Sequence, residues 1–480
     1  MLGKEFSKES EENIILLTDS YKCSHYSQYP ENTTKIYSYF ESRGGKFSEV
    51  CFYGLQIFIK KYLIGKVVTR EKIDEAEQLL NLHFGPSFEF PRHLWEHILT
   101  KHDGHLPIKI KAVPEGLCVP TKNVLFTMEN TDKECFWLTN YLETILVQVW
   151  YPMTVATNSR EQKKIILENL IETGDETTIG FKLHDFGYRG VSSNETAGIG
   201  ASAHLTQFLG TDTLAGLITC RRYYSDPEEN KTFCPGFSIP ASEHSTITSW
   251  GRDGEEDAYG NMLKKYPSGL VACVSDSWDI IAAVKIWGTK FRDEIMSREG
   301  TLVVRPDSGD PPTIIMSILN ELEKYFPVKV NEKGYKVLDE HIRVIQGDGI
   351  DYEMIKEILN VMKNEGWSGD NIAFGSGGGL LQKLNRDTMK CAFKCSMAVV
   401  DGRERYVYKD PVTDISKKSK KGYLKLVRED NSYKTVSSEI GEDLSKFFED
   451  DILQTVFENG KLKIDYEFEE IRNKNLFKNN

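Results

Sequence analysis

The residues best suited to chemistry lie in three glycine-rich turns in the second half of the chain. Each turn follows a short apolar run: TLVVRPDSG over 301–309, IRVIQGDG over 342–349 and NIAFGSGGG over 371–379. Strands buried on both faces have such continuous apolar runs, and α/β folds carry their chemistry where these strands end. Glycines let backbone N–H groups approach an anion, and arginine and aspartate place charges around it. The pattern predicts successive βα units that share one site for an anionic ligand.

A fourth turn, HDFGYRG over 184–190, combines an aromatic ring, an arginine and two glycines. Taken alone it is typical of a tight turn with Phe186 in the core and Arg189 in solvent. Arg305 and Arg386 lie near other glycine-rich turns. Because a guanidinium group binds two phosphate oxygens at once, these arginines together favour a diphosphate site.

His244 follows the segment Ser238-Ile239-Pro240 and is expected at the start of a helix. A single histidine is more often structural, but at a strand-to-helix junction it is also suited to proton or phosphoryl chemistry. Asp276 and Asp348 end apolar runs, where they could orient sugar hydroxyls or bind Mg²⁺. The alternative is that both cap the following helices.

Neither common nucleotide loop is convincing. The sequence has no GxxxxGK[ST], and Gly198-Ile199-Gly200 with Ala203 follows a polar stretch rather than a strand. We interpret this small-residue run as helix packing.

The elements that must position these residues change character near 180. From there, strand-like segments alternate with helical ones, which predicts a parallel, barrel-like sheet; the segments are 182–184, 236–239, 270–274, 302–304, 343–345 and 372–374. The first part mixes predicted strands at 13–17, 35–40 and 106–128 with helices at 54–63, 135–150 and 155–172, interrupted at Pro152. Beyond 401 the pattern is antiparallel, with a strand at 423–427 and a hairpin at Asn459-Gly460. We expect an α+β region over 1–178, an α/β barrel over 179–400, and a segment over 401–480 that returns to the α+β domain.

Composition narrows the class of protein. The chain has 480 residues, 40% of them hydrophobic and 28% charged, with a net charge of −12. A general nucleic-acid binder would be basic, no apolar run approaches the roughly 18 residues of a membrane span, and the N-terminal residues lack the apolar core of a signal peptide. The nine cysteines show no disulfide spacing. We expect a large enzyme with reduced thiols in the cytoplasm, with neither nucleic-acid nor membrane partners.

Eight segments together resemble the nicotinamide phosphoribosyltransferase family, which is of the type II, nicotinate phosphoribosyltransferase-like kind. They run in the family's order from about residue 13 into the C-terminal region: LLTDSYKCSHYSQYP, HDFGYRG, EHSTITSWG, VSDSWDI, RPDSGDP, VIQGDG, FGSGGGLLQKLNRD and FKCS. The chain departs from the vertebrate pattern between 43 and 51, where it is shorter, and at Ala272, where those enzymes have serine.

The resemblance implies an irregular α/β barrel with an additional α+β domain built from the N- and C-terminal segments. It implies transfer of the phosphoribosyl group of phosphoribosyl diphosphate to nicotinamide, giving nicotinamide mononucleotide and diphosphate in NAD salvage. Mg²⁺ is the expected cofactor, ATP the coupled energy source through a phosphohistidine, and a homodimer with shared active sites the expected assembly.

The resemblance also implies roles for individual residues. His244, the phosphorylated residue, and Asp307 are the expected catalytic pair. The diphosphate or nucleotide phosphate is assigned to Arg189, His244, Arg305, Gly378 and Arg386, and the ribose and phosphate to Arg305, Pro306, Asp307, Gly347 and Asp348. Phe186 stacks on one face of the pyridine ring and the partner subunit's Tyr21 on the other, Asp212 accepts from the carboxamide, and Asp19 completes the substrate-binding set. The metal ligands are not assigned, and Asp212 could alternatively be a helix cap.

Three other functions remain open from the sequence. Nicotinate phosphoribosyltransferase is the nearest, on a similar fold, and the base pocket would discriminate. A nucleotide-sensing or extracellular signalling protein on the same scaffold is disfavoured, since His244, Asp307 and the arginines are all present. A generic phosphosugar-binding barrel is the third.

Overall fold

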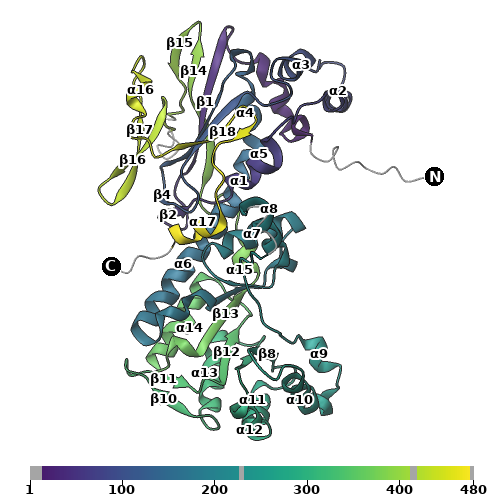
Figure 1. Cartoon of the computed structure of the whole chain (residues 1–480), viewed down its shortest axis with the longest axis vertical. Helices are drawn as coiled ribbons and strands as arrows, with labels where there is room; N and C mark the ends of the chain where they lie inside the picture. Colours follow the sequence, from purple (N-terminus) through teal and green to yellow (C-terminus); the bar gives the residue numbers. More distant parts are fainter. Residues whose placement is uncertain (1–12, 226–231, 411–418, 476–480) are drawn as a thin grey trace, which may run out of the picture. The chain divides into compact units, whose positions relative to one another are not determined.

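The computed structural model describes residues 13–225, 232–410 and 419–475 (Figure 1). The chain forms two compact units, one of residues 1–154 with 385–480 and the other of residues 155–384. The first division falls inside helix α6 (Trp150–Thr173), before the boundary at 178 drawn from the sequence. The second precedes 400, because strand β14 (Cys391–Val400) pairs with β1 (Thr33–Ser42) and so belongs to the unit that contains the N-terminal segment.

The first unit is built on an antiparallel sheet of seven strands in the order β15-β14-β1-β5-β3-β18-β19. The strands not yet given are β15 (Arg403–Tyr406), β5 (Val124–Asn130), β3 (Ile108–Ala112), β18 (Gln454–Glu458) and β19 (Lys461–Leu462). The expected return of the C-terminal segment is confirmed, since β18 pairs with β3. The expected hairpin is confirmed as well: Asn459 and Gly460 join β18 to β19 with φ of 50° and 77°, as a two-residue turn of type I′ requires.

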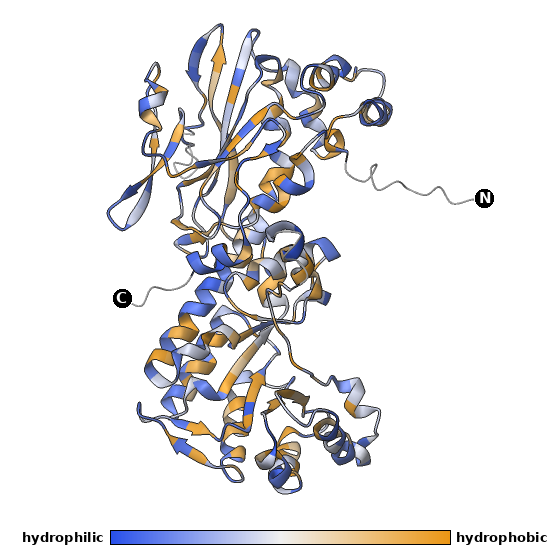
Figure 2. Cartoon of the chain, viewed as in Figure 1, coloured by the Kyte–Doolittle hydropathy of each residue, from blue (hydrophilic) through white to orange (hydrophobic). Residues whose placement is uncertain are grey.

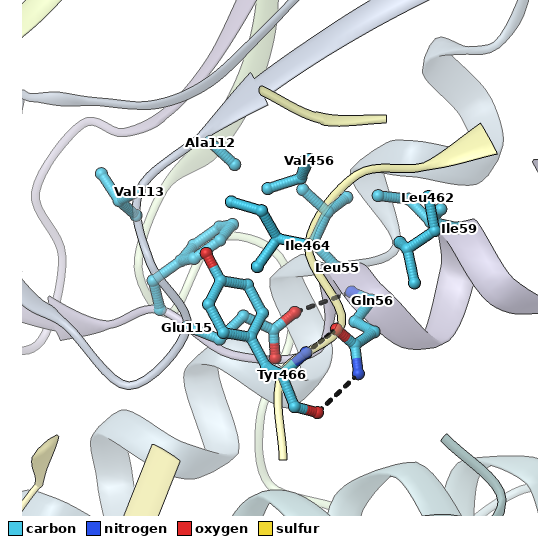
Figure 3. Close-up of a pocket in the computed structure, with 11 residues that line it drawn as sticks. Leu55, Gln56, Ile59, Ala112, Val113, Glu115, Val456, Leu462, Ile464 and Tyr466 are labelled. Atoms are coloured by element: carbon cyan, nitrogen blue, oxygen red, sulfur yellow. Dashed lines mark hydrogen bonds between the residues drawn. The ribbon is translucent and has the colours of Figure 1, made fainter. Parts of the chain in front are cut away.

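Polar side chains fasten the C-terminal segment to the first half of the chain (Figure 3). Buried Gln56 accepts from the backbone N–H of Tyr466 at 2.8 Å and donates to its carbonyl at 2.9 Å. Buried Glu115 accepts from the backbone N–H of Gln56 at 2.7 Å. Each of these groups would cost free energy if it were left unpaired in the core, so the three residues specify where the chain returns.

The remaining elements of this unit are short strand pairs and helices. They are η2 (Ile14–Leu16), η3 (Ser20–Ser27), β2 (Glu49–Cys51), α1 (Leu55–Phe58), η4 (Ile59–Leu63), α2 (Arg70–Phe84), α3 (Arg92–Lys101), β4 (Cys118–Pro120), η5 (Lys133–Cys135), α4 (Leu138–Tyr141), α5 (Glu143–Val147), β16 (Leu424–Glu429), β17 (Ser432–Ser437), α16 (Leu444–Phe447) and α17 (Phe468–Lys474).

The helix predicted over 135–150 is divided into the short helices α4 and α5, and two other local predictions for this unit are wrong. The segment 13–17 is a 3₁₀ turn rather than a strand, because the Asn13 side chain accepts from the backbone N–H of Ile15 and so starts a turn. The expected break at Pro152 lies earlier, since α6 begins at Trp150 and Pro152 stands in its first turn. There the missing N–H of proline would have had no partner within the helix.

The second unit is built on a parallel sheet in the order β7-β6-β13-β12-β9-β8. Its strands are β6 (Leu183–Asp185), β7 (Gly210–Thr211), β8 (Val271–Val274), β9 (Leu302–Arg305), β12 (Ile342–Gln346) and β13 (Ile372–Ser376). Five of the six predicted strands are therefore confirmed. Around them lie η6 (Glu176–Phe181), η7 (Tyr188–Gly190), α7 (Asn194–Leu205), α8 (Leu214–Tyr224), α9 (His244–Thr248), η9 (Arg252–Gly254), α10 (Glu255–Lys265), α11 (Ile280–Thr289), α12 (Arg292–Ser297), α13 (Pro311–Leu322), β10 (Val328–Val330), β11 (Lys336–Leu338), α14 (Tyr352–Asn364), η10 (Gly369–Asn371) and α15 (Gly378–Leu381).

The sixth predicted strand, at 236–239, is replaced by a segment that bridges both edges of the sheet. Phe237 forms a parallel bridge with Gly210 on β7, and Ala241 forms one with Ala272 on β8. Pro240 has no N–H to contribute to a continuous ladder, so only single bridges form. The segment 237–241 thus connects the first strand position to the last, and the sheet is an irregular barrel.

Side chains alternate across this sheet. Leu302 and Val304 of β9 join the large core between strands and helices, whereas Val303 joins a small apolar cluster with Ala272 and Ile345. Apolar residues accordingly concentrate in the strands, and the helices carry hydrophilic residues on part of their surface (Figure 2). The small cluster also contacts Phe186, and this contact places the ring of a predicted site residue on it.

The small residues of α7 serve helix packing, as the sequence interpretation held. A Cβ on Gly198 would lie 2.4 Å from Thr219 Oγ1, and a Cβ on Gly216 would lie 2.5 Å from the Cβ of Ala201, so α7 and α8 touch closely. Across the described ranges, no helix has both the length and the apolar character of a membrane span.

Candidate active site

Three strands of the barrel end in one repeated pattern, an aspartate followed three residues later by a second aspartate. The first members are Asp276, Asp307 and Asp348, which follow β8, β9 and β12. The second members cap the next helices with their side chains; these are Asp279, Asp310 and Asp351. The capping alternative is therefore wrong for Asp276 and Asp348. The carboxyl ends of parallel strands lie at one edge of a sheet. Asp276, Asp307 and Asp348, which cap no helix, can therefore form a site there.

His244 lies between two of these carboxylates. Its Nε2 is 3.1 Å from Asp276 Oδ1, and its Nδ1 is 3.7 Å from Asp307 Oδ2. The other oxygen of Asp276 accepts from the backbone N–H of Asp307 at 2.9 Å and from the hydroxyl of Ser308. His244 starts α9 as predicted. The Asp276 side chain, only 5% exposed, thus orients both the imidazole and the turn that carries Asp307.

Asp307 has a perturbed carboxyl group. Burial raises its pKa above the usual value, and the nearby carboxylates of Asp276 and Asp348 add to the rise, whereas Arg305 and His244 oppose it. Like charges in a cleft are typical of functional sites and of sites that a cation completes.

A second group of polar side chains lies around Asp212. His184 Nε2 is 2.8 Å from Asp212 Oδ1, and the Ser238 hydroxyl donates to the same oxygen. Burial opposes ionisation of Asp212, but the hydrogen bonds from these two residues outweigh it and leave its pKa below the usual value. The N-cap residue of α8 is Thr213, so the helix-cap alternative for Asp212 is wrong. An ionised carboxylate accepts hydrogen bonds without donating any.

The ring of Phe186 packs against the backbone of two glycines, Gly375 and Gly347. A Cβ on Gly375 would be 1.9 Å from the Cε2 atom of the ring, and a Cβ on Gly347 would be 3.1 Å from the same atom. The Gly347 position is also 3.9 Å from Asp307 Oδ1. Buried Asp185 accepts from the backbone N–H of Gly187 at 2.7 Å and holds the turn that presents the ring. The Phe186 ring and the Asp307 carboxylate therefore both lie close to Gly347.

The charge of Arg305 acts on both polar groups, the one around His244 and the one around Asp212. Its charge lowers the pKa of Asp212 and opposes the rise at Asp307. Its Nε is buried and has no hydrogen-bond partner in the ranges that the structure describes. Pro306 beside it is buried. A buried guanidinium N–H without a partner is costly, and a bound oxyanion would satisfy it.

Arg189 and Gly378 come from neighbouring strand ends, in η7 after β6 and in α15 after β13. A Cβ on Gly190 would be 2.9 Å from Gln382 Oε1, so the turn that carries Arg189 packs against the end of α15. The Arg189 side chain is exposed.

Three predicted site residues, Asp19, Tyr21 and Arg386, belong to the other compact unit. Asp19 accepts from the hydroxyl of Thr144 at 2.8 Å. Tyr21 is 58% exposed, and its ring meets the edge of His25 with centroids 4.9 Å apart. Arg386 is exposed at the start of the segment that leads into β14.

The sequence pattern indicates no role for His184 or Ser238, and it predicts Asp276 only as a sugar-binding, metal-binding or capping residue. The repeated Asp-x-x-Asp pattern was a usable signal for Asp276, since one aspartate suffices to cap each helix. His184 and Ser238 gave no such signal, because each acts through Asp212, 28 and 26 residues away.

Comparisons with known proteins agree with this geometry. The nicotinate phosphoribosyltransferase (NAPRTase) family model matches residues 181–461, and the N-terminal domain model of nicotinamide phosphoribosyltransferase matches residues 13–110. A protein from Xanthomonas campestris named nicotinamide phosphoribosyltransferase is 48% identical over 96% of this chain and 97% of its own length. One of the same name from Acinetobacter baylyi is 32% identical over 96% of both chains.

Two solved structures share the fold. Nicotinate-nucleotide pyrophosphorylase from Pyrococcus furiosus matches with a TM-score of 0.61 at 15% identity, covering 98% of this chain and 97% of that one. Human nicotinic acid phosphoribosyltransferase matches with a TM-score of 0.54 at 14% identity, covering 96% and 93%. With the family model spanning more than half of its length, the chain belongs to the nicotinate phosphoribosyltransferase (NAPRTase) family and is a phosphoribosyltransferase, an enzyme of the pentosyltransferase class.

Proposed function

We propose that the protein transfers the phosphoribosyl group of phosphoribosyl diphosphate to nicotinamide, releasing nicotinamide mononucleotide and diphosphate. The observation that carries this choice of base is the ionised Asp212, whose partner His184 has its ring centroid 5.2 Å from that of Phe186. The names of the two bacterial relatives support it.

Asp212 suits an amide better than an acid. His184 and Ser238 both donate to Oδ1, and Oδ2 has no hydrogen bond within the described residues, so it can accept from a carboxamide N–H. Nicotinate would bring a second carboxylate against it, and like charges juxtaposed in a partly desolvated site repel. Phe186 would stack on the pyridine ring and hold its nitrogen toward the ribose.

The opposite end of the pocket suits the phosphoribosyl group. Displacement of diphosphate develops positive charge on the ribose and negative charge on the leaving group, and arginine side chains stabilise the latter. Arg305 has an unpartnered buried N–H, and Arg189 and the backbone of Gly378 lie at neighbouring strand ends. We assign the phosphates to these groups and to Arg386, and the ribose hydroxyls to Asp307 and Asp348.

Mg²⁺ is the proposed cofactor, and the residues fit it. Asp307 and Asp348 supply hard oxygen donors, and their repulsion, which helps to raise the pKa of Asp307, is of the kind that a divalent cation relieves. When bound, the ion would neutralise charge on the departing diphosphate.

His244 is the proposed site of phosphorylation by ATP. Asp276 accepts from Nε2–H and so leaves the lone pair of the ring on Nδ1, the nitrogen on the side of Asp307. We propose that Nδ1 attacks the terminal phosphorus of ATP, forming an N–P bond as ADP departs, and that the added charge favours turnover.

We further propose a homodimer in which the partner subunit's Tyr21 covers the second face of the base. The large exposed fraction of Tyr21 is consistent with a role completed by a second copy. All nine cysteines are free thiols, which favours a reducing compartment such as the cytoplasm.

One assay tests the proposal. Purified protein is incubated with phosphoribosyl diphosphate, Mg²⁺ and either nicotinamide or nicotinate, with and without ATP, and the product is identified by mass. Nicotinamide mononucleotide as the main product supports the proposal. Nicotinate mononucleotide as the main product would assign the chain to the second candidate function, which the name of the family model favours.

A further inference from the structure

A second cluster of reactive side chains lies in the other compact unit, outside the residues assigned to catalysis. It consists of His97, His102, Asp132 and Cys135, whose ligand atoms all lie within 4.8 Å of one another. The Nε2 atoms of His97 and His102 are 2.8 Å and 2.6 Å from the same oxygen, Asp132 Oδ2.

The fold brings two separate segments together here. The histidines lie in the second half of α3 and at its C-cap, and the other two residues belong to η5, Asp132 as its N-cap and Cys135 as its last residue. Strand β3 begins after the first segment and β5 ends before the second, and their antiparallel register pairs Ile108 with Asn130. The backbone N–H of Thr131 also donates to the carbonyl of Pro107 at 2.8 Å, so the two segments are held side by side.

A hydrogen-bonded cluster alone explains only part of this arrangement. Two imidazoles that donate to one carboxylate oxygen account for His97, His102 and Asp132. They do not account for Cys135, which is fully buried with its sulfur among these ligand atoms. In the described part of the chain this sulfur has no hydrogen bond. The three polar side chains are themselves largely shielded, with 20–26% of each exposed.

The donor set matches one class of metal ion. Two imidazole nitrogens, one thiolate and one carboxylate oxygen suit zinc, whereas Mg²⁺ and Ca²⁺ prefer oxygen ligands alone. Four residues separate the histidines and two separate Asp132 from Cys135, which are spacings found in zinc ligand pairs. Tetrahedral bonds of about 2.0–2.3 Å put ligand atoms roughly 3.3–3.7 Å apart. The separations in the cluster run from 2.6 Å, between His102 and Asp132, up to at most 4.8 Å, and so include this range.

We propose that these four side chains form a structural zinc site, the α3–η5 site, which fastens the end of α3 to the start of η5. All four ligands come from the protein, so no coordination position is left for a substrate, as in structural rather than catalytic zinc centres. Binding releases the thiol proton of Cys135 and any proton that the ion displaces from the imidazole nitrogens. Asp132 keeps its second oxygen on the backbone N–H of Glu134 at 2.9 Å, which orients it as a ligand.

The test uses the full-length protein, freed of metal with a zinc-selective chelator and then titrated with zinc chloride alone. Wild type should bind one equivalent per chain, measured by elemental analysis after desalting. Cys135→Ser and His102→Gln should each bind at least about 100-fold more weakly, since loss of a direct ligand costs more than loss of a supporting contact. His93→Gln, a change of an exposed histidine on the same helix α3, is the matched control and should bind as wild type.

Two further readouts separate a zinc site from a structural cluster. Cobalt(II) should give a thiolate charge-transfer band that is absent in Cys135→Ser, and zinc should raise the melting temperature of wild type by at least about 3 °C but not that of His102→Gln. Less than a fifth of an equivalent bound by refolded wild type would overturn the proposal. Zinc affinity unchanged in both ligand variants, or lost equally in His93→Gln, would also overturn it.

Discussion

Replacing Asp212 by asparagine should largely abolish the choice between nicotinamide and nicotinate. Two carboxylates about 4 Å apart repel by about 4 kcal/mol at an effective dielectric constant near 20. Because 47% of the Asp212 side chain is exposed, we halve this to about 2 kcal/mol. An amide hydrogen bond to an ionised acceptor contributes about 2 kcal/mol more. The sum, about 4 kcal/mol, corresponds to a roughly thousandfold preference for nicotinamide in kcat/KM.

The asparagine can keep the local structure. Its carbonyl oxygen can accept from both His184 and Ser238, as Oδ1 does now, and its amide then replaces Oδ2 with a donor. Each of the two free-energy terms is worth about 30-fold, so kcat/KM should rise about 30-fold for nicotinate and fall about 30-fold for nicotinamide. The two values would become nearly equal.

Steady-state assays with both bases, at saturating phosphoribosyl diphosphate, measure these changes. Asp293→Asn on α12, where the carboxylate is 99% exposed, removes the same charge and should leave the ratio near its wild-type value. Equal use of the two bases by wild type, or a parallel change of both kcat/KM values in Asp212→Asn, would refute this role of Asp212.

Four other variants probe the rest of the site. His244→Ala should abolish ATP hydrolysis coupled to turnover and greatly weaken product formation; coupled hydrolysis at the wild-type rate would refute the phosphohistidine. Tyr21→Ala and Arg189→Ala should each be nearly inactive, but mixed subunits should recover about a quarter of wild-type activity, since random dimers of a shared site leave one intact site in half of them; no recovery after verified exchange would exclude sharing. Gly375→Ala would put a methyl carbon 1.9 Å from the ring of Phe186 and should raise the KM for the base at least about tenfold, with a melting temperature within a few degrees of wild type; an unchanged KM would argue against stacking on this ring.

The parallel strands were predictable where burial on both faces leaves a continuous apolar run. This holds for β8, β9, β12 and β13, each of which lies near its predicted segment. Strand β7 has only two residues, too few for a recognisable strand pattern, so the local sequence could not predict it. The segment 237–241 has strand composition, but only Phe237 and Ala241 pair with the sheet. The positions of the two sheet edges decide which residues pair, and the local sequence does not contain those positions.

The candidate site divides in the same way. The chemical groups of the site could be predicted from the sequence, because charge, ring and backbone flexibility are properties of single residues. These groups are the arginines, the aspartates, His244 and the glycine turns. Only the folded chain shows which aspartate of each Asp-x-x-Asp pair caps a helix and which is left at the end of its strand. It also decided that His184 meets Asp212, since the parallel register of β6 and β7 sets His184 opposite Gly210 and so beside the turn that follows. Such pairings depend on strand register between distant segments, and no local pattern of residues encodes that register.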